Sequence, residues 1–132
     1  MRTDPVVNLY KQEWDCDREA GRAIRAGDVE RARKLAQRSF AAADALAEIA
    51  PTSPEGAAIQ AKLAATYLAN RGAIARLESI ARRLARSRYS PADIRELRAI
   101  AVACDVGTHG EDGAMAGVHL RLALKGVGPR LV

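Results

Sequence analysis

An apolar stripe between Ser53 and Tyr89 constrains the fold of this 132-residue chain more than any other feature. Large side chains recur there in steps of three and four residues, which is close to the period of a helical seam. The positions are Ile59, Leu63, Tyr67, Ile74, Leu77 and Leu84, with Asn70 and Ala81 completing the stripe. A helix cannot cover such a stripe with its own residues. Other segments of the chain, or a second copy, must therefore pack against it.

The same stretch begins with a clear helix start, in which Ser53 caps free backbone N–H groups and Pro54 fits the first helical position. The apolar phase continues through Gly72, which favours one long helix over about residues 53–89. The alternative is a break, with one helix ending near Asn70 and another beginning near Ala73. In a continuous helix Asn70 would lie at a core position, where a buried amide can fix the register of pairing.

Two further helices are expected before this stretch. Asp4-Pro5 predicts the start of a helix that runs to about Ala26, and Gly27-Asp28 ends it and begins the next. Inward-facing positions are assigned by helical spacing, and they include Val6, Tyr10, Trp14, Ile24, Val29 and Phe40. The pattern Gly27-Asp28 followed by Ala32 and later Pro51 resembles one turn and helix of a tetratricopeptide repeat. The repeat period does not return, so the pattern predicts a helical hairpin.

The C-terminal part of the chain has its own start and stop signals. Ser90-Pro91 begins a helix, and three glycines between Gly107 and Gly113 indicate a loop. A last helix is expected from about Asp112 to Lys125. Leu120 and Leu124 point away from its main apolar face, which predicts that this helix is sandwiched or lies at an interface.

These signals predict an all-α fold. We expect a single helical domain over residues 1–132, with four to five helices in an antiparallel bundle or helical-hairpin array around the 53–89 helix. The chain has 28 alanines but only five aromatic residues, so its core buries little area per residue. A thin core favours self-association, and we expect a dimer that uses Asn70, Leu120 and Leu124.

The net charge of +5 is concentrated in one segment. Residues 51–89 contain seven basic and two acidic side chains, whereas the remaining segments are balanced. A basic surface for a partner or for nucleic acid phosphates is therefore a candidate site, formed by Arg82, Arg83, Arg86, Arg88, Arg95 and Arg98. The alternative is a solvated helix end whose cations complement the helix dipole.

No catalytic, cofactor or metal signature is found in the sequence. Cys104, His109 and His119 are of types that bind zinc, but their spacing matches no known metal motif. Cys16 and Cys104 are expected to be reduced thiols. No apolar run suggests a signal peptide or a membrane span, so we expect a cytoplasmic protein. An excess of arginine over lysine, 17 to 4, together with the many alanines, suggests a bacterial source.

The sequence therefore favours a non-enzymatic regulatory or adaptor module that acts through protein–protein interaction or self-association. The alternative is a small DNA- or RNA-binding regulator that uses the arginine-rich region 82–98. The partner and the biological process are not indicated.

Overall fold

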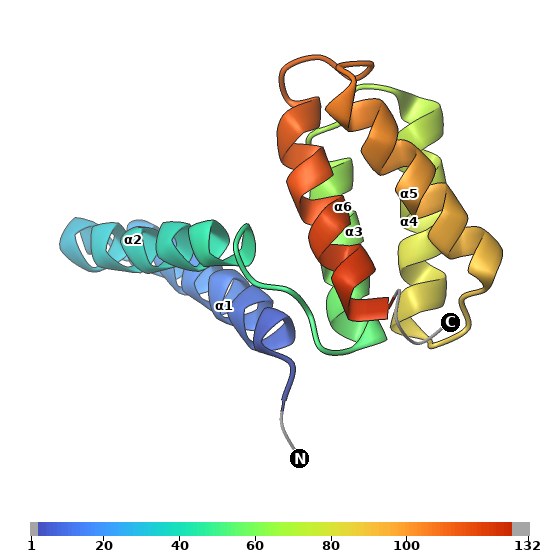
Figure 1. The fold of residues 1–132 in the computed structure, drawn as a ribbon. Helices are drawn as coiled ribbons and strands as arrows, with labels where there is room; N and C mark the ends of the chain where they lie inside the picture. The colour runs from blue at the N-terminus through green and yellow to red at the C-terminus, as the bar shows by residue number, and fades with distance from the viewer. Residues whose placement is uncertain (1–2, 128–132) are drawn as a thin grey trace.

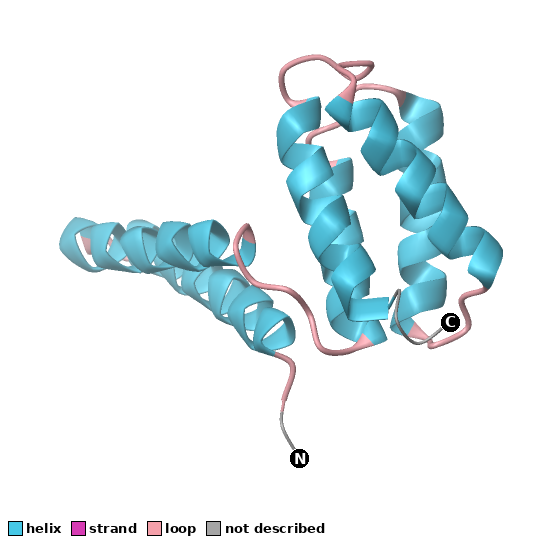
Figure 2. Cartoon of the chain, in the orientation of Figure 1, coloured by secondary structure: helices cyan, strands magenta, loops and turns pink. Residues whose placement is uncertain are grey.

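The computed structural model describes residues 3–127, and this part of the chain is entirely helical apart from turns and loops (Figures 1 and 2). The described residues form six helices and no strand: α1 (Pro5–Arg25), α2 (Val29–Leu46), α3 (Pro54–Ala65), α4 (Arg71–Ala85), α5 (Pro91–Asp105) and α6 (Gly113–Val127). The all-α prediction is confirmed. The expected count of four to five helices is wrong, because the long central helix is divided in two.

The break in the expected 53–89 helix lies between Ala65 and Arg71. The side chain of Asn70 accepts a hydrogen bond of 2.9 Å from the backbone N–H of Ala73, and so caps α4. Asn70 is exposed and does not occupy the core position that a continuous helix would give it. The cap, with Gly72 weakening the next turn, lets the chain reverse and pack α4 against α3.

The helices form two groups (Figure 1). Helices α1 and α2 pair as an N-terminal hairpin that projects to the side of the other four. Helices α3 to α6 lie side by side, with consecutive helices running in opposite directions, and are called the bundle below. Helix α3 contacts α1, α4 and α6, so it joins the two groups. None of the described helices is both long and apolar enough to span a membrane.

One apolar cluster forms the core of the bundle and draws on all four of its helices. Leu77, Leu84, Leu97 and Leu120 are completely buried in it, and alanines fill much of the space between them. Leu124 packs against the same cluster. Leu120, which was predicted to lie at a dimer interface, is therefore covered within its own chain, whereas Leu124 is only partly buried.

The hairpin is less well covered than the bundle. Its contact relies on small buried residues such as Ala23, Ala32 and Ala42, and on a 2.8 Å hydrogen bond from Ser39 Oγ to Asp17 Oδ1. Several predicted inward-facing residues are instead exposed: Trp14, Ile24, Val29 and Phe40. The reason is that only two helices are present here, so no third helix covers their outer faces.

Candidate functional site

The base of the hairpin is fixed to the bundle by Asp4, which is 5% exposed. One carboxylate oxygen caps α1 by accepting from the backbone N–H of Val6 at 2.9 Å. The other accepts from Thr52 N at 3.0 Å and from Ser53 Oγ at 2.5 Å. Ser53 in turn caps α3 through Gly56 N. A single carboxylate thus links the starts of α1 and α3.

A second buried link is made by Gln60 of α3, which is completely buried. Its amide nitrogen donates to the carbonyl oxygens of Leu46 at 2.8 Å and Ile49 at 3.0 Å, at the end of α2. Its amide oxygen lies 2.6 Å from Nδ1 of His119 on α6. Because buried amides are costly without partners, this arrangement fixes the end of α2 against the bundle.

The joint between hairpin and bundle is also closely packed. Val6, Leu46 and Ile59 form a small apolar cluster that is shared by α1, α2 and α3. Pro51 lies between two glycines: a Cβ at either Gly56 or Gly126 would come within 2.7 Å of the proline ring. The angle between the hairpin and the bundle is therefore set by contacts within the chain. The space between them is present without a ligand.

That space is a cleft of about 750 Å³ between α1, α3 and α4. One wall is a face of α1 that carries Tyr10 and Trp14, whose rings meet edge to face with centroids 6.2 Å apart. Trp14 is 55% exposed, which is unusual for the only tryptophan in the chain. The floor is made of small and apolar residues, namely Ala58, Ile59, Ala81 and Ala85.

The rims of the cleft are basic. Five basic and two acidic side chains line it, a net charge of +3: Lys11, Arg18, Lys62, Arg82 and Arg86 against Asp15 and Glu55. Arg18 is paired with Asp15 at 2.6 Å. The other four cations form no ion pair with any residue in 3–127. Their charges are therefore available to a ligand.

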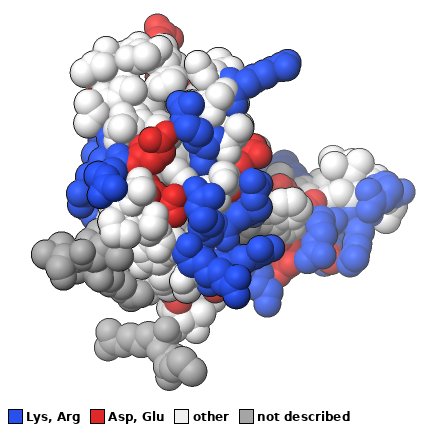
Figure 3. Space-filling model, turned by 90° about the vertical axis from the view of Figure 1, so that its right-hand side faces the viewer, with Lys and Arg blue, Asp and Glu red and all other residues white. Residues whose placement is uncertain are grey.

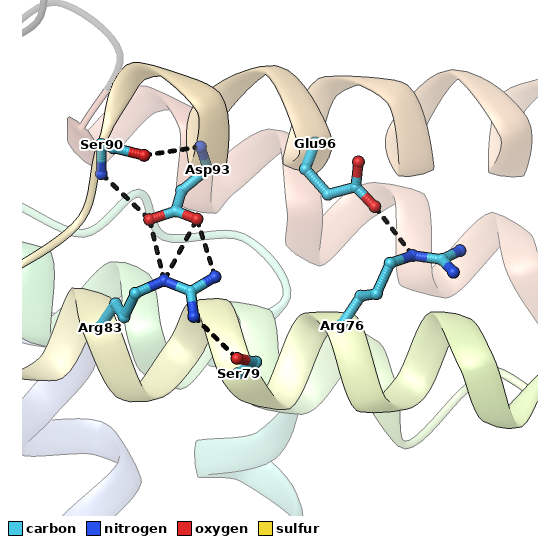
Figure 4. A network of polar contacts seen from close by, with 6 residues as sticks. All are labelled: Arg76, Ser79, Arg83, Ser90, Asp93 and Glu96. Atoms are coloured by element: carbon cyan, nitrogen blue, oxygen red, sulfur yellow. Dashed lines mark hydrogen bonds and ion pairs between the residues drawn. The ribbon is translucent and has the colours of Figure 1, made fainter.

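Arg83, by contrast, is committed to a structural contact (Figure 4). Its guanidinium donates to both carboxylate oxygens of Asp93 at 2.8–3.2 Å and to Ser79 Oγ at 2.8 Å. Asp93 also accepts from the backbone N–H of Ser90 and completes the capping box of α5. The hydrogen bonds from Arg83 hold the pKa of Asp93 below its ordinary range. With the Arg76–Glu96 pair at 2.8 Å, this network ties α4 to α5.

The six arginines predicted to form a basic surface therefore lie in different environments. Arg82 and Arg86 line the cleft, and Arg83 joins two helices. Arg88, Arg95 and Arg98 are exposed and do not line the cleft. Figure 3 shows basic side chains over the lower part of the α4–α5 side of the bundle, with acidic side chains between them.

The residues weighed as metal ligands are placed in the core and in a loop. Cys104 is buried, and burial raises the pKa of its thiol. His119 is buried against Gln60 and stacks on Tyr67, and burial lowers the pKa of its imidazole. His109 lies in the loop before α6. Among residues 3–127, no group of three or more His, Cys, Asp and Glu side chains is placed to hold a metal ion.

Two features of the site were not predicted from the sequence. Gln60 lies within an alanine-rich segment, and a polar residue in a helix that is buried on most sides signals a buried hydrogen-bonding partner. Tyr10 and Trp14 were recognised as one face of α1, but the spacing did not show that this face borders a cleft. No protein-family model, curated protein or solved structure matches this chain.

Proposed function

We propose that this chain is a non-enzymatic adaptor module that recognises another protein through the cleft between the hairpin and the bundle. The observation that carries the proposal is the cleft itself. Its position is fixed by the buried links of Asp4 and Gln60, and it exposes Trp14 beside an apolar floor. Exposed aromatic residues in a preformed hollow are typical of protein recognition sites.

A second candidate function is the binding of DNA or RNA. Arg82 and Arg86 on the rim favour it, because they form no ion pair within residues 3–127 and such side chains bind phosphate groups. Against it, Arg83 is held by Asp93, and Arg95 and Arg98 lie outside the cleft. A basic groove that exposes aromatic side chains is also an arrangement that binds single-stranded nucleic acid, because bases stack on the rings, so Tyr10 and Trp14 are compatible with this candidate as well.

Selection of peptides from a random display library on the immobilised chain tests the adaptor proposal. The selected peptides are then measured against Trp14→Ala and against Phe40→Ala as the matched control. Both residues are exposed aromatics of the hairpin, at 55% and 69% exposure, but only Trp14 lines the cleft. We expect the peptides to shift the emission of Trp14 and to lose affinity only for Trp14→Ala.

Two outcomes would refute this function. One is that no selected peptide distinguishes the two variants. The other is that duplex DNA or RNA binds with Kd below about 1 μM at about 150 mM salt, since non-specific binding is ordinarily weaker.

A further inference from the structure

The shape and charge of the cleft indicate what kind of partner it binds, provided that the cleft has the proposed adaptor function. We propose that its occupant is an acidic amphipathic helix of a partner protein. The apolar face of that helix would contact Trp14 and the floor of the cleft. Its carboxylates would lie beside the cleft cations that form no ion pair within the described part of the chain, namely Lys11, Lys62, Arg82 and Arg86.

The lining residues indicate that the occupant is helical. On α1 they recur over about three turns of one face, at Val7, Tyr10, Lys11, Trp14, Asp15 and Arg18. The floor and opposite wall are faces of α3 and α4. A groove between helix faces suits a helix that presents apolar residues every three to four positions. Alanines at Ala58, Ala81 and Ala85 leave room for large side chains of the partner.

The charges indicate that the occupant is acidic. Lys11 comes from α1, Lys62 from α3, and Arg82 and Arg86 from the C-terminal end of α4, so each of the three helices that line the cleft contributes at least one cation. An amphipathic helix with Glu or Asp beside its apolar stripe would match this pattern. A second copy of this chain is a poor occupant, because a chain of net charge +5 would meet a site of net charge +3.

Synthetic peptides of about 15 residues, roughly four helical turns, test this inference with the full-length chain. The first has Leu at positions i, i+3, i+4 and i+7 and Glu on the flanking positions. The second carries Lys in place of Glu. The third has the composition of the first in an order that does not separate the apolar residues onto one face. The emission of Trp14 reports occupation of the cleft, provided that the peptides contain no tryptophan.

We expect the acidic amphipathic peptide to bind and to shift the Trp14 emission to shorter wavelength. The lysine peptide and the reordered peptide should bind at least about tenfold more weakly, because each lacks one of the two complementary features. Binding of the acidic peptide should weaken between about 50 and about 300 mM salt, since its rim contacts are partly exposed to solvent.

Two charge variants then locate the contact. Arg82→Gln with Arg86→Gln removes two cleft cations, and Arg95→Gln with Arg98→Gln removes two exposed cations elsewhere. Both double variants lower the net charge equally. We expect the first to weaken the acidic peptide about five- to tenfold and the second to change its affinity less than about twofold. Far-UV circular dichroism checks that both variants are folded.

Three results would overturn the inference. They are equal binding of the lysine peptide, equal binding of the reordered peptide, and equal loss in the two double variants. If display-selected peptides bind beside Trp14 but are neutral or extended, the acidic-helix inference fails while the adaptor function stands. If no peptide of any class occupies the cleft, the adaptor function fails as well.

Discussion

The joint between hairpin and bundle is tested most directly by Gly56→Ala. Gly56 lies in the first turn of α3, where the side chain of Asp4 occupies the space next to its Cα. An added Cβ would overlap Oδ2 of Asp4 and would lie 2.7 Å from both Asp4 Cγ and Pro51 Cβ. Asp4 can escape only by giving up its hydrogen bonds to Thr52 and Ser53.

Opposing effects of known size determine the result. Replacing glycine by alanine in a helix gains about 0.5–1 kcal/mol. Forcing an extra carbon into a filled space costs about 1–3 kcal/mol. A hydrogen bond to a charged group contributes about 1.5–3 kcal/mol, and Asp4 would lose up to two while remaining buried. We expect a net loss of about 2–3 kcal/mol in the free energy of unfolding, since movement of Asp4 relieves part of the overlap.

Urea denaturation followed by far-UV circular dichroism measures this change, with Gly21→Ala as the matched control. Gly21 lies within α1, and its added Cβ would meet only the flexible end of Arg25, at 3.5 Å. The control should therefore gain about 0.5–1 kcal/mol. If Gly56→Ala proves as stable as Gly21→Ala, the contacts described for Asp4 do not hold the joint.

Two further predictions concern single side chains. Asn70→Ala should lower the free energy of unfolding by about 1 kcal/mol through loss of the α4 cap, and Asn70→Leu should also destabilise the chain. Urea denaturation measures both changes. A gain in stability for Asn70→Leu would indicate that residue 70 lies in the core, as a continuous helix would place it. Because burial lowers the pKa of His119 from 6.5, the unfolded chain takes up the proton first. The contribution of neutral His119 to the free energy of unfolding should therefore be fully present above about pH 6.5, and it should decrease as the pH falls below that value. The urea midpoint of the parent chain, measured from about pH 5 to 8, should fall at low pH, and this fall should be smaller in His119→Gln. An equal fall in the two proteins would show that His119 is not its cause.

Helix starts were predictable from the sequence because each depends on a few neighbouring residues. Asp4-Pro5, Ser53-Pro54 and Ser90-Pro91 each place a capping side chain before a proline that fits the first turn, and the structure has helices at all three. The break between α3 and α4 was not predictable in this way. The apolar phase stays in register across residues 66–70, so periodicity alone cannot distinguish one helix from two that fold back on each other.

The candidate site could be predicted only in part. Charge counting identified the segment that holds Arg82 and Arg86, but it also included Arg83, whose role depends on Asp93 ten residues away. Whether an arginine is free or paired is decided by tertiary contacts. The cleft depends on the direction in which the hairpin leaves the bundle. That direction is set by the contacts of Asp4 and Gln60, which no local pattern reveals.

The distribution of alanine connects the stability of this fold to its proposed function. In the bundle, alanines between large leucines allow close packing of four helices, and a single apolar cluster results. In the hairpin, alanines such as Ala23 and Ala32 bring two helices together but leave no large core between them. The hairpin's larger side chains then contribute little to folding unless something covers them, as the exposure of Trp14 illustrates. Asp4 and Gln60 fix the start of α1 and the end of α2 against the bundle, so the helix that carries Trp14 is already in place. A partner that buries Trp14 would therefore not have to order this helix, and most of the apolar contact would contribute to binding.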